Sequence, residues 1–243
     1  MSTATAAADH SELRSSFAAG TTRPVSHRRD QLEKLLRLLV ESDRELCAAI
    51  TSDLGRHESS AYTGDVYPAI CQVKTALASL GKWVAPLQIG VPFYLLPGKA
   101  ELVPEPKGVV LIISPFNYPV TLLFSPLAAA LAAGNAVFLK PSEQAPATSK
   151  LLAHLVRRYL DPSTVRILEG GVELSNALLE LRWDHILYTG SPRIGRIVAR
   201  AAAASLTYAP HRSSATSAFA IHAFAGHAFA PRCGQAVHAR AGR

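Results

Sequence analysis

The sequence predicts an α/β fold, a Rossmann-like parallel sheet with flanking helices that is preceded by an N-terminal helical segment. The main observation is a regular alternation in which short apolar runs are each followed by a segment with helical spacing; the runs are 108–113, 136–140, 164–168 and 184–188. Parallel strands need long crossover connections, and helices supply them on both faces of the sheet. The second observation is composition: 49% of the 243 residues are hydrophobic, enough to fill a core.

Residues 1–85 are expected to form a helical part of the same domain. Four leucines recur at three- and four-residue spacing behind a candidate cap at Ser26; they are Leu32, Leu35, Leu36 and Leu39. Ser42 and Glu45 have the Ser-x-x-Glu spacing of a capping box, and Gly55 is a suitable stop for the helix that they open. A third helical stretch follows, and Pro68 predicts a kink in it.

Two changes of pattern set the other boundaries. Between 86 and 106, short apolar runs alternate with prolines and glycines, which predicts a bridging hairpin with a role in oligomerisation. Residues 107–204 then hold the four predicted strands. From 205 to 243 the pattern is lost: AFAIH, AFAGH and AFAPR are near-copies of a five-residue unit, a period too short for a packed repeat. This last segment is expected to be low-complexity and disordered.

The formal net charge of +7 does not indicate a nucleic-acid-binding surface. Four arginines and no acidic residue lie in 205–243; subtracting these four from the 25 lysines and arginines leaves 21 against 18 acidic residues, a net charge of +3. Such a balance is ordinary for a soluble enzyme domain. Without a folded groove, the four arginines give at most weak, salt-sensitive binding. The histidines of this segment match no zinc spacing, so we expect neither a nucleic-acid partner nor a metal site.

The cysteines and the first residues favour a cytoplasmic protein. Three scattered cysteines are too few for a disulfide framework, which favours a reducing compartment. Asp9 and Glu12 lie near the N-terminus without an apolar core, unlike a secretory signal. The stretch 108–139 has no charged residue, but serines, prolines and asparagines interrupt it. We therefore expect a buried strand, loop, helix and strand there, and no transmembrane segment.

The residues that follow each predicted strand are the candidates for function, because ligands of parallel α/β sheets bind beyond the carboxyl ends of the strands. After the first strand, Asn117 can point an amide donor at a developing oxyanion. The alternative is a proline-rich turn capped by Asn. After the second strand, Lys140 and Glu143 can hold the vicinal hydroxyls of a ribose, with Glu accepting and Lys donating. The alternative is a surface lysine and a glutamate favoured at a helix start.

Glycines follow the third and fourth strands. Gly170 and Gly171 let the backbone approach a ligand closely, or make a tight turn. Gly190 and Gly195 bound a G-x-x-x-x-G segment that opens a helix, where backbone N–H groups and the positive helix end can bind a phosphate. The segment lacks the Lys-Ser/Thr of a P-loop and the GxGxxG of the usual dinucleotide fingerprint. The segment indicates a ligand site mainly because it follows a strand of the same predicted sheet, as the other three candidate segments do.

The chain resembles the aldehyde dehydrogenase superfamily, and most nearly its class 3, fatty-aldehyde-like branch. The stretches that carry the resemblance are PKGVVLIISPFNYP, AALAAGNAVFLKPSE and DHILYTGSPRIGR. They occur in the family's order, and the resemblance runs from about residue 10 to 204. It implies that 107–204 is the Rossmann-like, NAD(P)-binding part of an aldehyde dehydrogenase fold.

The resemblance also assigns roles to the strand-end residues. Asn117 matches the oxyanion-hole asparagine, and Lys140 and Glu143 match the contacts to the adenosine ribose. The other expected cofactor-binding residues are Ser114, Pro115, Phe116, Ser142, Gly171, Gly190, Ser191 and Gly195. The expected cofactor is NAD, because the Glu143 carboxylate would repel a 2′-phosphate, with NADP as the alternative. The expected substrate is a small-molecule aldehyde.

The family's reaction needs residues that these 243 positions do not contain. A cysteine thiolate attacks the aldehyde, hydride passes to NAD(P), and a glutamate acts as base in hydrolysing the thioester. In relatives a Glu-Leu-Gly-Gly-Lys strand supplies the base and a Gly-Gln-x-Cys segment supplies the nucleophile. Neither occurs here, and Cys233-Gly234-Gln235 has the letters in another order. We therefore expect a truncated homologue, inactive alone, whose sequence departs from the family near Ser205.

A second interpretation stays open at this point. The chain could be a non-catalytic nucleotide-binding or partner-binding protein that pairs with a full-length relative, or with a second copy, through the hairpin near 91–104. This interpretation predicts saturable NAD binding that is weakened by Lys140→Ala. Both interpretations place the cofactor at the same strand ends.

Overall fold

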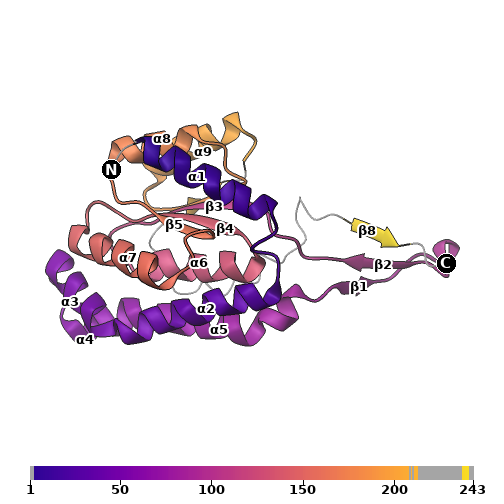
Figure 1. Cartoon of the computed structure of the whole chain (residues 1–243), viewed down its shortest axis with the longest axis horizontal. Helices are drawn as coiled ribbons and strands as arrows, with labels where there is room; N and C mark the ends of the chain where they lie inside the picture. Colours follow the sequence, from indigo (N-terminus) through magenta and orange to yellow (C-terminus); the bar gives the residue numbers. More distant parts are fainter. Residues whose placement is uncertain (1–2, 208, 210, 213–236, 241–243) are drawn as a thin grey trace.

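The computed structural model describes residues 3–207, 209, 211–212 and 237–240. Figure 1 shows an α/β body from which a two-stranded hairpin projects. The predicted fold class is confirmed: the body is a parallel sheet with helices on both of its faces. Most of the segment predicted to be low-complexity and disordered, 213–236, lies outside the described residues.

The sheet contains the four strands that the apolar runs predict. They are β3 (Val109–Ile113), β4 (Ala136–Lys140), β5 (Val165–Ile167) and β6 (His185–Thr189), and a short fifth strand follows them, β7 (His211–Arg212). The order is β5-β4-β3-β6-β7, and all neighbours are parallel. Every residue of β3, β4 and β6 is buried, as expected for strands that are covered on both faces.

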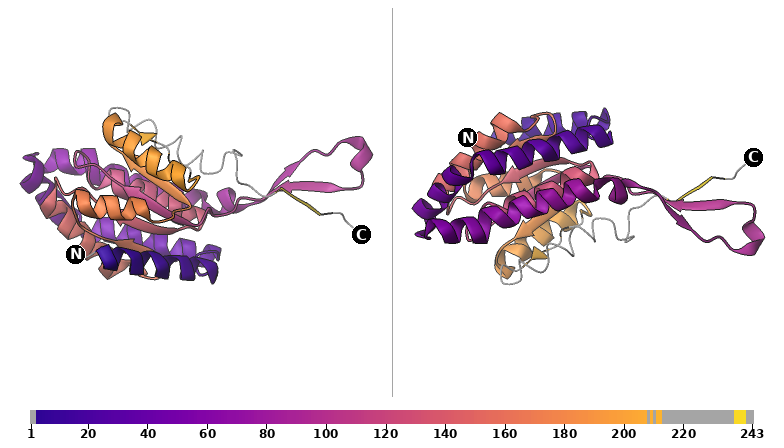
Figure 2. Two further views of the ribbon diagram at one scale, coloured as in Figure 1. Left: turned by 90° about the horizontal axis from the view of Figure 1, so that it is seen from above. Right: turned by 90° about the horizontal axis from the view of Figure 1, so that it is seen from below.

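Helices cover the two faces of the sheet in separate layers (Figures 1 and 2). On one face lie α6 (Thr121–Ala133) and α7 (Pro146–Tyr159), with α2 (Val25–Glu41), α3 (Asp43–Leu54) and α5 (Tyr67–Val84) packed outside them. On the other face lie α1 (Thr3–Ala18), α8 (Val172–Glu180) and α9 (Pro192–Ala204). Alternate residues of β3 point to the two cores: Val110 and Ile112 to the first, Val109 and Leu111 to the second.

The predicted helix signals in the N-terminal part have different outcomes. The residue before α2 is Pro24, so Ser26 lies inside the helix and does not cap it. Ser42 is the residue before α3, as predicted, but its side chain makes no capping bond; its backbone N–H donates to Leu38 O at the end of α2. Gly55 does end α3, in the left-handed conformation at φ 65°.

The third helical stretch is interrupted directly before Pro68. A short helix α4 (Glu58–Ala61) leads into a π-helical turn η1 (Tyr62–Val66), and α5 starts directly after it. Pro68 lies in the first turn of α5, and a proline lacks the N–H and crowds the carbonyl four residues earlier, here that of Gly64 in η1. The helical irregularity predicted at Pro68 is therefore a π turn.

The projecting hairpin is formed by β1 (Leu87–Ile89) and β2 (Lys99–Leu102), which pair antiparallel with Leu87 opposite Leu102. A 3-10 turn η2 (Phe93–Leu95) lies between them. Strand β8 (Val237–Arg240) pairs antiparallel with the free edge of β2. Within the described part of the chain, no helix is long and apolar enough to cross a membrane.

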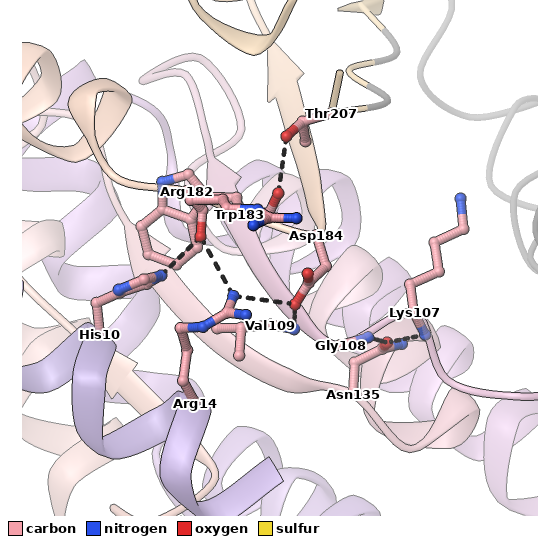
Figure 3. A network of polar contacts seen from close by, with 10 residues as sticks. All are labelled: His10, Arg14, Lys107, Gly108, Val109, Asn135, Arg182, Trp183, Asp184 and Thr207. Atoms are coloured by element: carbon pink, nitrogen blue, oxygen red, sulfur yellow. Dashed lines mark hydrogen bonds and ion pairs between the residues drawn. The ribbon is translucent and has the colours of Figure 1, made fainter. Parts of the chain in front are cut away.

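A polar network at the amino ends of the strands fixes their register (Figure 3). The Asn135 side-chain oxygen accepts from the N–H groups of Lys107 and Gly108, at 2.8 and 3.1 Å. Asp184 accepts from Val109 N–H at 2.8 Å and pairs with Arg14 of α1 at 3.4 Å. Gly108 has φ 138°, and a Cβ there would collide with the Asp184 carboxylate. These bonds tie together the amino ends of the strands. The candidate site lies at the opposite, carboxyl ends.

Candidate functional site

The strand order places a topological switch point between β3 and β6. The chain runs from β3 to β4 and β5 in one direction, and then returns to place β6 on the other side of β3. At such a point the connections after the two central strands leave the sheet on opposite faces, which opens a crevice at their carboxyl ends. The residues that follow β3, β4 and β6 lie at this end of the sheet, where such a crevice is expected.

The segment after β3 carries Asn117. Ser114 N–H donates to the carbonyl oxygen of Lys140 at 3.2 Å, which joins this segment to the end of β4. The Ser114 side chain is buried, and its hydroxyl has no hydrogen-bond partner among the described residues. The Asn117 side-chain oxygen accepts from Tyr118 N–H at 3.1 Å, and the side chain is half-buried. Its amide nitrogen is therefore the atom that can donate a hydrogen bond to a ligand. Phe116 is exposed beside it.

The segment after β4 carries a buried lysine and a more exposed glutamate. Lys140 Nζ donates to Glu143 Oε2 at 2.6 Å and to Pro141 O at 3.0 Å; the Lys140 side chain is 3% exposed and that of Glu143 41%. Partial burial acts to raise the pKa of Glu143, but the hydrogen bond from Lys140, a backbone hydrogen bond and the lysine charge outweigh it and lower the pKa. Ser142 holds the turn, since its carbonyl accepts from Ser149 Oγ at 2.6 Å.

The segment after β6 starts α9. Ser191 caps the helix, with its Oγ accepting from Ile194 N–H at 3.5 Å, and Gly195 N–H donates to Ser191 O at 3.0 Å. A Cβ on Gly190 would collide with the end of the Tyr188 side chain, so the space beside that ring, and not the backbone conformation, favours glycine there. The first turn of α9 therefore faces the carboxyl edge with its N–H groups and with no bulky side chain at Gly190.

Gly171 is set apart from the other predicted residues. It precedes α8, and its carbonyl accepts from Ser175 N–H and Oγ, both at 3.1 Å. A Cβ on Gly171 would meet nothing within 4 Å. Its strand, β5, is at the edge of the sheet and two strands away from β3. The structure thus brings together the segments after β3, β4 and β6, and leaves Gly171 at the periphery.

Three charged residues that support the site were not predicted from the sequence. Asp53 accepts from the N–H groups of Ala147 and Thr148 at 3.0 and 2.7 Å and so caps α7. Arg56 and Asp65 contact the segment after β3. All three lie in the N-terminal helical part, and no sequence motif marks them, because their partners are more than fifty residues away.

Among the residues that the structure describes, no cluster of three or more His, Cys, Asp or Glu side chains could hold a metal ion. The chemistry of the crevice is instead that of hydrogen-bond donors, one carboxylate and a helix N-terminus. These groups suit a ligand with vicinal hydroxyls and phosphates. The fold belongs to the class of doubly wound α/β folds, in which ligands bind at the carboxyl ends of the strands beside the switch point.

Comparison with known proteins identifies the family. Residues 2–233 match the Aldehyde dehydrogenase family, and the chain belongs to it. It is 47% identical over 196 residues to aldehyde dehydrogenase family 3 member H1 of Arabidopsis thaliana, covering 81% of this chain and 40% of that protein. It is 40% identical over 195 residues to family 3 member A2 of Macaca fascicularis, covering 80% and 40%. The chain thus spans about two fifths of the length of these curated relatives.

A solved structure supports the same assignment. AldH of Staphylococcus aureus in a substrate-bound state superposes with a TM-score of 0.82 at 33% sequence identity. The superposition covers 84% of this chain and 44% of the AldH chain. The similarity to class 3 members that the sequence motifs indicate is therefore confirmed.

Proposed function

We propose that the described body is the dinucleotide-binding part of an NAD(P)-dependent aldehyde dehydrogenase, which oxidises an aldehyde to a carboxylic acid. The observation that carries the proposal is the convergence of three segments, after β3, β4 and β6, at the switch point of the sheet. Members of this family use NAD(P). The residues present suit such a cofactor, since the crevice offers a carboxylate, an ammonium group and a helix N-terminus.

Lys140 and Glu143 would hold the adenosine ribose. The lowered pKa of Glu143 keeps its carboxylate ionised at neutral pH, so it accepts hydrogen bonds from both ribose hydroxyls. Lys140 Nζ already donates to Pro141 and Glu143, which leaves its third N–H for a ribose oxygen. The same ionised carboxylate would repel a 2′-phosphate. We therefore propose NAD over NADP as the cofactor.

The first turn of α9 would bind the pyrophosphate. Gly190 and Ser191 bring the N–H groups of this turn to the carboxyl edge, and the helix dipole favours an anion there. Gly195 lies buried one turn into the helix. Ser142 and Gly171 would take part less directly, because Ser142 holds the turn after β4 and Gly171 lies at the periphery.

Asn117 would lie at the nicotinamide end of the cofactor site, where the aldehyde reacts. Ser114, Pro115 and Phe116 run along the nicotinamide side in this proposal, and the Asn117 amide nitrogen would donate to the oxygen of the attacked aldehyde. The nucleophilic cysteine and the general-base glutamate of the family lie in segments that do not occur in these 243 residues. A polypeptide of these residues should therefore bind the dinucleotide without oxidising aldehydes.

The hairpin would provide a pairing surface for a homodimer or heterodimer. Its exposed side chains are large and apolar: Phe93 is 85% exposed, Tyr94 71% and Leu96 65%. Exposed apolar groups on a projecting element are typical of protein–protein contacts. Sedimentation of the purified chain tests this, because Phe93→Ser with Leu96→Ser should shift any dimer to monomer. A dimer that withstands both changes would place the interface elsewhere.

Isothermal titration calorimetry with NAD and NADP tests the cofactor proposal. Glu143→Gln keeps the shape of the side chain and removes its charge, so it should weaken NAD binding by about tenfold and strengthen NADP binding. Glu173→Gln, on the exposed surface of α8, is the matched control and should leave both affinities unchanged. Equal effects of the two substitutions would contradict the role of Glu143.

A further inference from the structure

The loop that links β3 to α6, residues 114–120, is bonded to the sheet at its start and to residues outside the sheet farther on. Ser114 N–H donates to Lys140 O, whereas Arg56, which follows α3, and Asp65, in the π turn η1, bond to Asn117 and to the residues where α6 begins. The proposed cofactor site includes neither Arg56 nor Asp65. Each of them nevertheless contacts Asn117 or a residue within four positions of it.

Arg56 fixes the peptide that follows Asn117. Its Nη2 donates to the Asn117 carbonyl oxygen at 2.6 Å, and its guanidinium carbon lies 4.3 Å from the centre of the Tyr118 ring. A guanidinium can do both because it is planar and carries five donors. Arg56 thus holds both the carbonyl of Asn117 and the ring of the next residue.

Asp65 fixes the end of the loop where α6 begins. Its carboxylate accepts from Thr121 N–H at 2.6 Å and from Val120 N–H at 3.4 Å, and the residue is fully buried. Helix α6 has no side-chain cap of its own, since the residue before it is Val120. The cap that a Ser, Asp or Asn at that position would provide comes instead from η1. A π turn is a frequent feature at functional sites, and here it carries the capping carboxylate.

We propose that Arg56 and Asp65 are positioning residues that hold the loop 114–120 so that the Asn117 amide faces the crevice. The proposal rests on the proposed function for the role of Asn117, whereas the contacts themselves do not depend on it. The side-chain oxygen of Asn117 is held by Tyr118 N–H, and Arg56 holds the carbonyl of the same residue. The direction of the amide nitrogen therefore depends on both bonds. Losing Arg56 should disturb the nicotinamide side of the crevice and leave the ribose contacts at β4 intact.

Amide hydrogen exchange tests the positioning without any ligand. Arg56→Ala should speed exchange of the 116–121 amides by about tenfold relative to those of β3, because the loop opens without unfolding the sheet. Arg56→Lys, which keeps the positive charge but not the planar guanidinium with its several donors, should give a smaller increase in the exchange rate. Asp65→Asn should speed exchange at Val120 or Thr121, since an amide keeps one acceptor where the carboxylate has two. Arg44→Ala, on the exposed face of α3, is the control. Unchanged exchange in 116–121 would overturn the proposal.

Calorimetric titration with NAD and with ADP then tests the consequence for the site. ADP carries the adenosine ribose and the phosphates but no nicotinamide, so Arg56→Ala should weaken NAD binding by about tenfold and leave ADP binding unchanged. Equal NAD affinities for the unmodified chain and Arg56→Ala would refute the positioning role while leaving the proposed function intact. If the folded, unmodified chain bound neither nucleotide, the proposed function would fail, whereas the hold of Arg56 and Asp65 on the loop would still be decided by hydrogen exchange.

Discussion

Asp65 gives the protein a pH dependence of stability that can be worked out from its surroundings. Burial raises the pKa of this carboxyl to about 7, against the lowering effect of the hydrogen bonds from Thr121 and Val120 and of the Arg56 charge. In the unfolded chain the same group titrates near 3.8. A raised carboxyl pKa means that the folded state keeps a proton that the unfolded state has already lost. The stability from this group is therefore full below about pH 4 and is lost as the pH rises to about 7.

The size of the effect follows from the two pKa values. One pKa unit is worth about 1.4 kcal/mol, so the whole rise corresponds to about 4 kcal/mol. Between roughly pH 5 and pH 8 the part that is lost is about 2.5 kcal/mol. Asp65→Asn removes the titrating proton and keeps the size of the side chain. The free energy of unfolding of the unmodified chain, minus that of the variant, should fall by this amount between the two pH values.

Urea unfolding at both pH values measures that difference. His185 acts in the opposite direction, because burial, together with the nearby Lys107 charge, lowers its pKa to about 3, so stability is lost as the pH falls below about 6.5. Both proteins contain His185, and its contribution cancels in the difference. If the two stability curves ran parallel from pH 5 to pH 8, the account of Asp65 as a buried carboxyl with a raised pKa would be wrong.

Three further substitutions test the packing around the sheet by urea unfolding. Asn135→Ala leaves two backbone N–H groups without their acceptor and should cost about 1–3 kcal/mol; a loss below 0.5 kcal/mol, roughly the scatter of surface substitutions, would contradict this. Gly190→Ala should destabilise the protein through collision with the end of the Tyr188 side chain, and less so in a Tyr188→Leu background, which removes both the hydroxyl and the ring carbons beside it; equal losses in both would refute the collision. Trp183→Phe loses a buried hydrogen bond and ring volume, at a cost of about 1–3 kcal/mol. An unchanged urea concentration at the unfolding midpoint would contradict this loss.

Strands β3, β4 and β6 were predictable because each is covered on both faces and is therefore mainly apolar, as Val109–Ile113 is. Helix α1 was covered only by the general expectation of helices in residues 1–85. Its buried face consists of Ala6, His10 and Leu13. Because alanine is small and histidine is polar, these residues do not form a clear apolar pattern with helical spacing. The cap predicted at Ser42 failed for a different reason. Two helices meet at that residue, and the local spacing carries no information about the second one.

The residues of the candidate site also fall into those that the sequence predicts and those that it does not. Lys140 ends β4, and Asn117, Glu143 and Gly190 lie within four residues after their strands, so the rule that ligands bind at carboxyl ends selects them from sequence order alone. Arg56 and Asp65 reach the site from positions 61 and 56 residues away from their partners. The packing of α5 against α6, and of η1 against α3 and α5, brings them there. A single sequence shows no pattern for contacts of that kind.

Calorimetric titration of NAD into the folded chain, with ADP as competitor, tests the central claim most directly. The account predicts saturable binding of one NAD per chain, competition by ADP, and a several-fold loss of affinity for both in Lys140→Ala. Lys150→Ala, which removes an exposed lysine of α7, should bind like the unmodified chain. A flat titration on a chain whose circular dichroism shows the α/β fold would contradict the claim that the strand ends form a dinucleotide site.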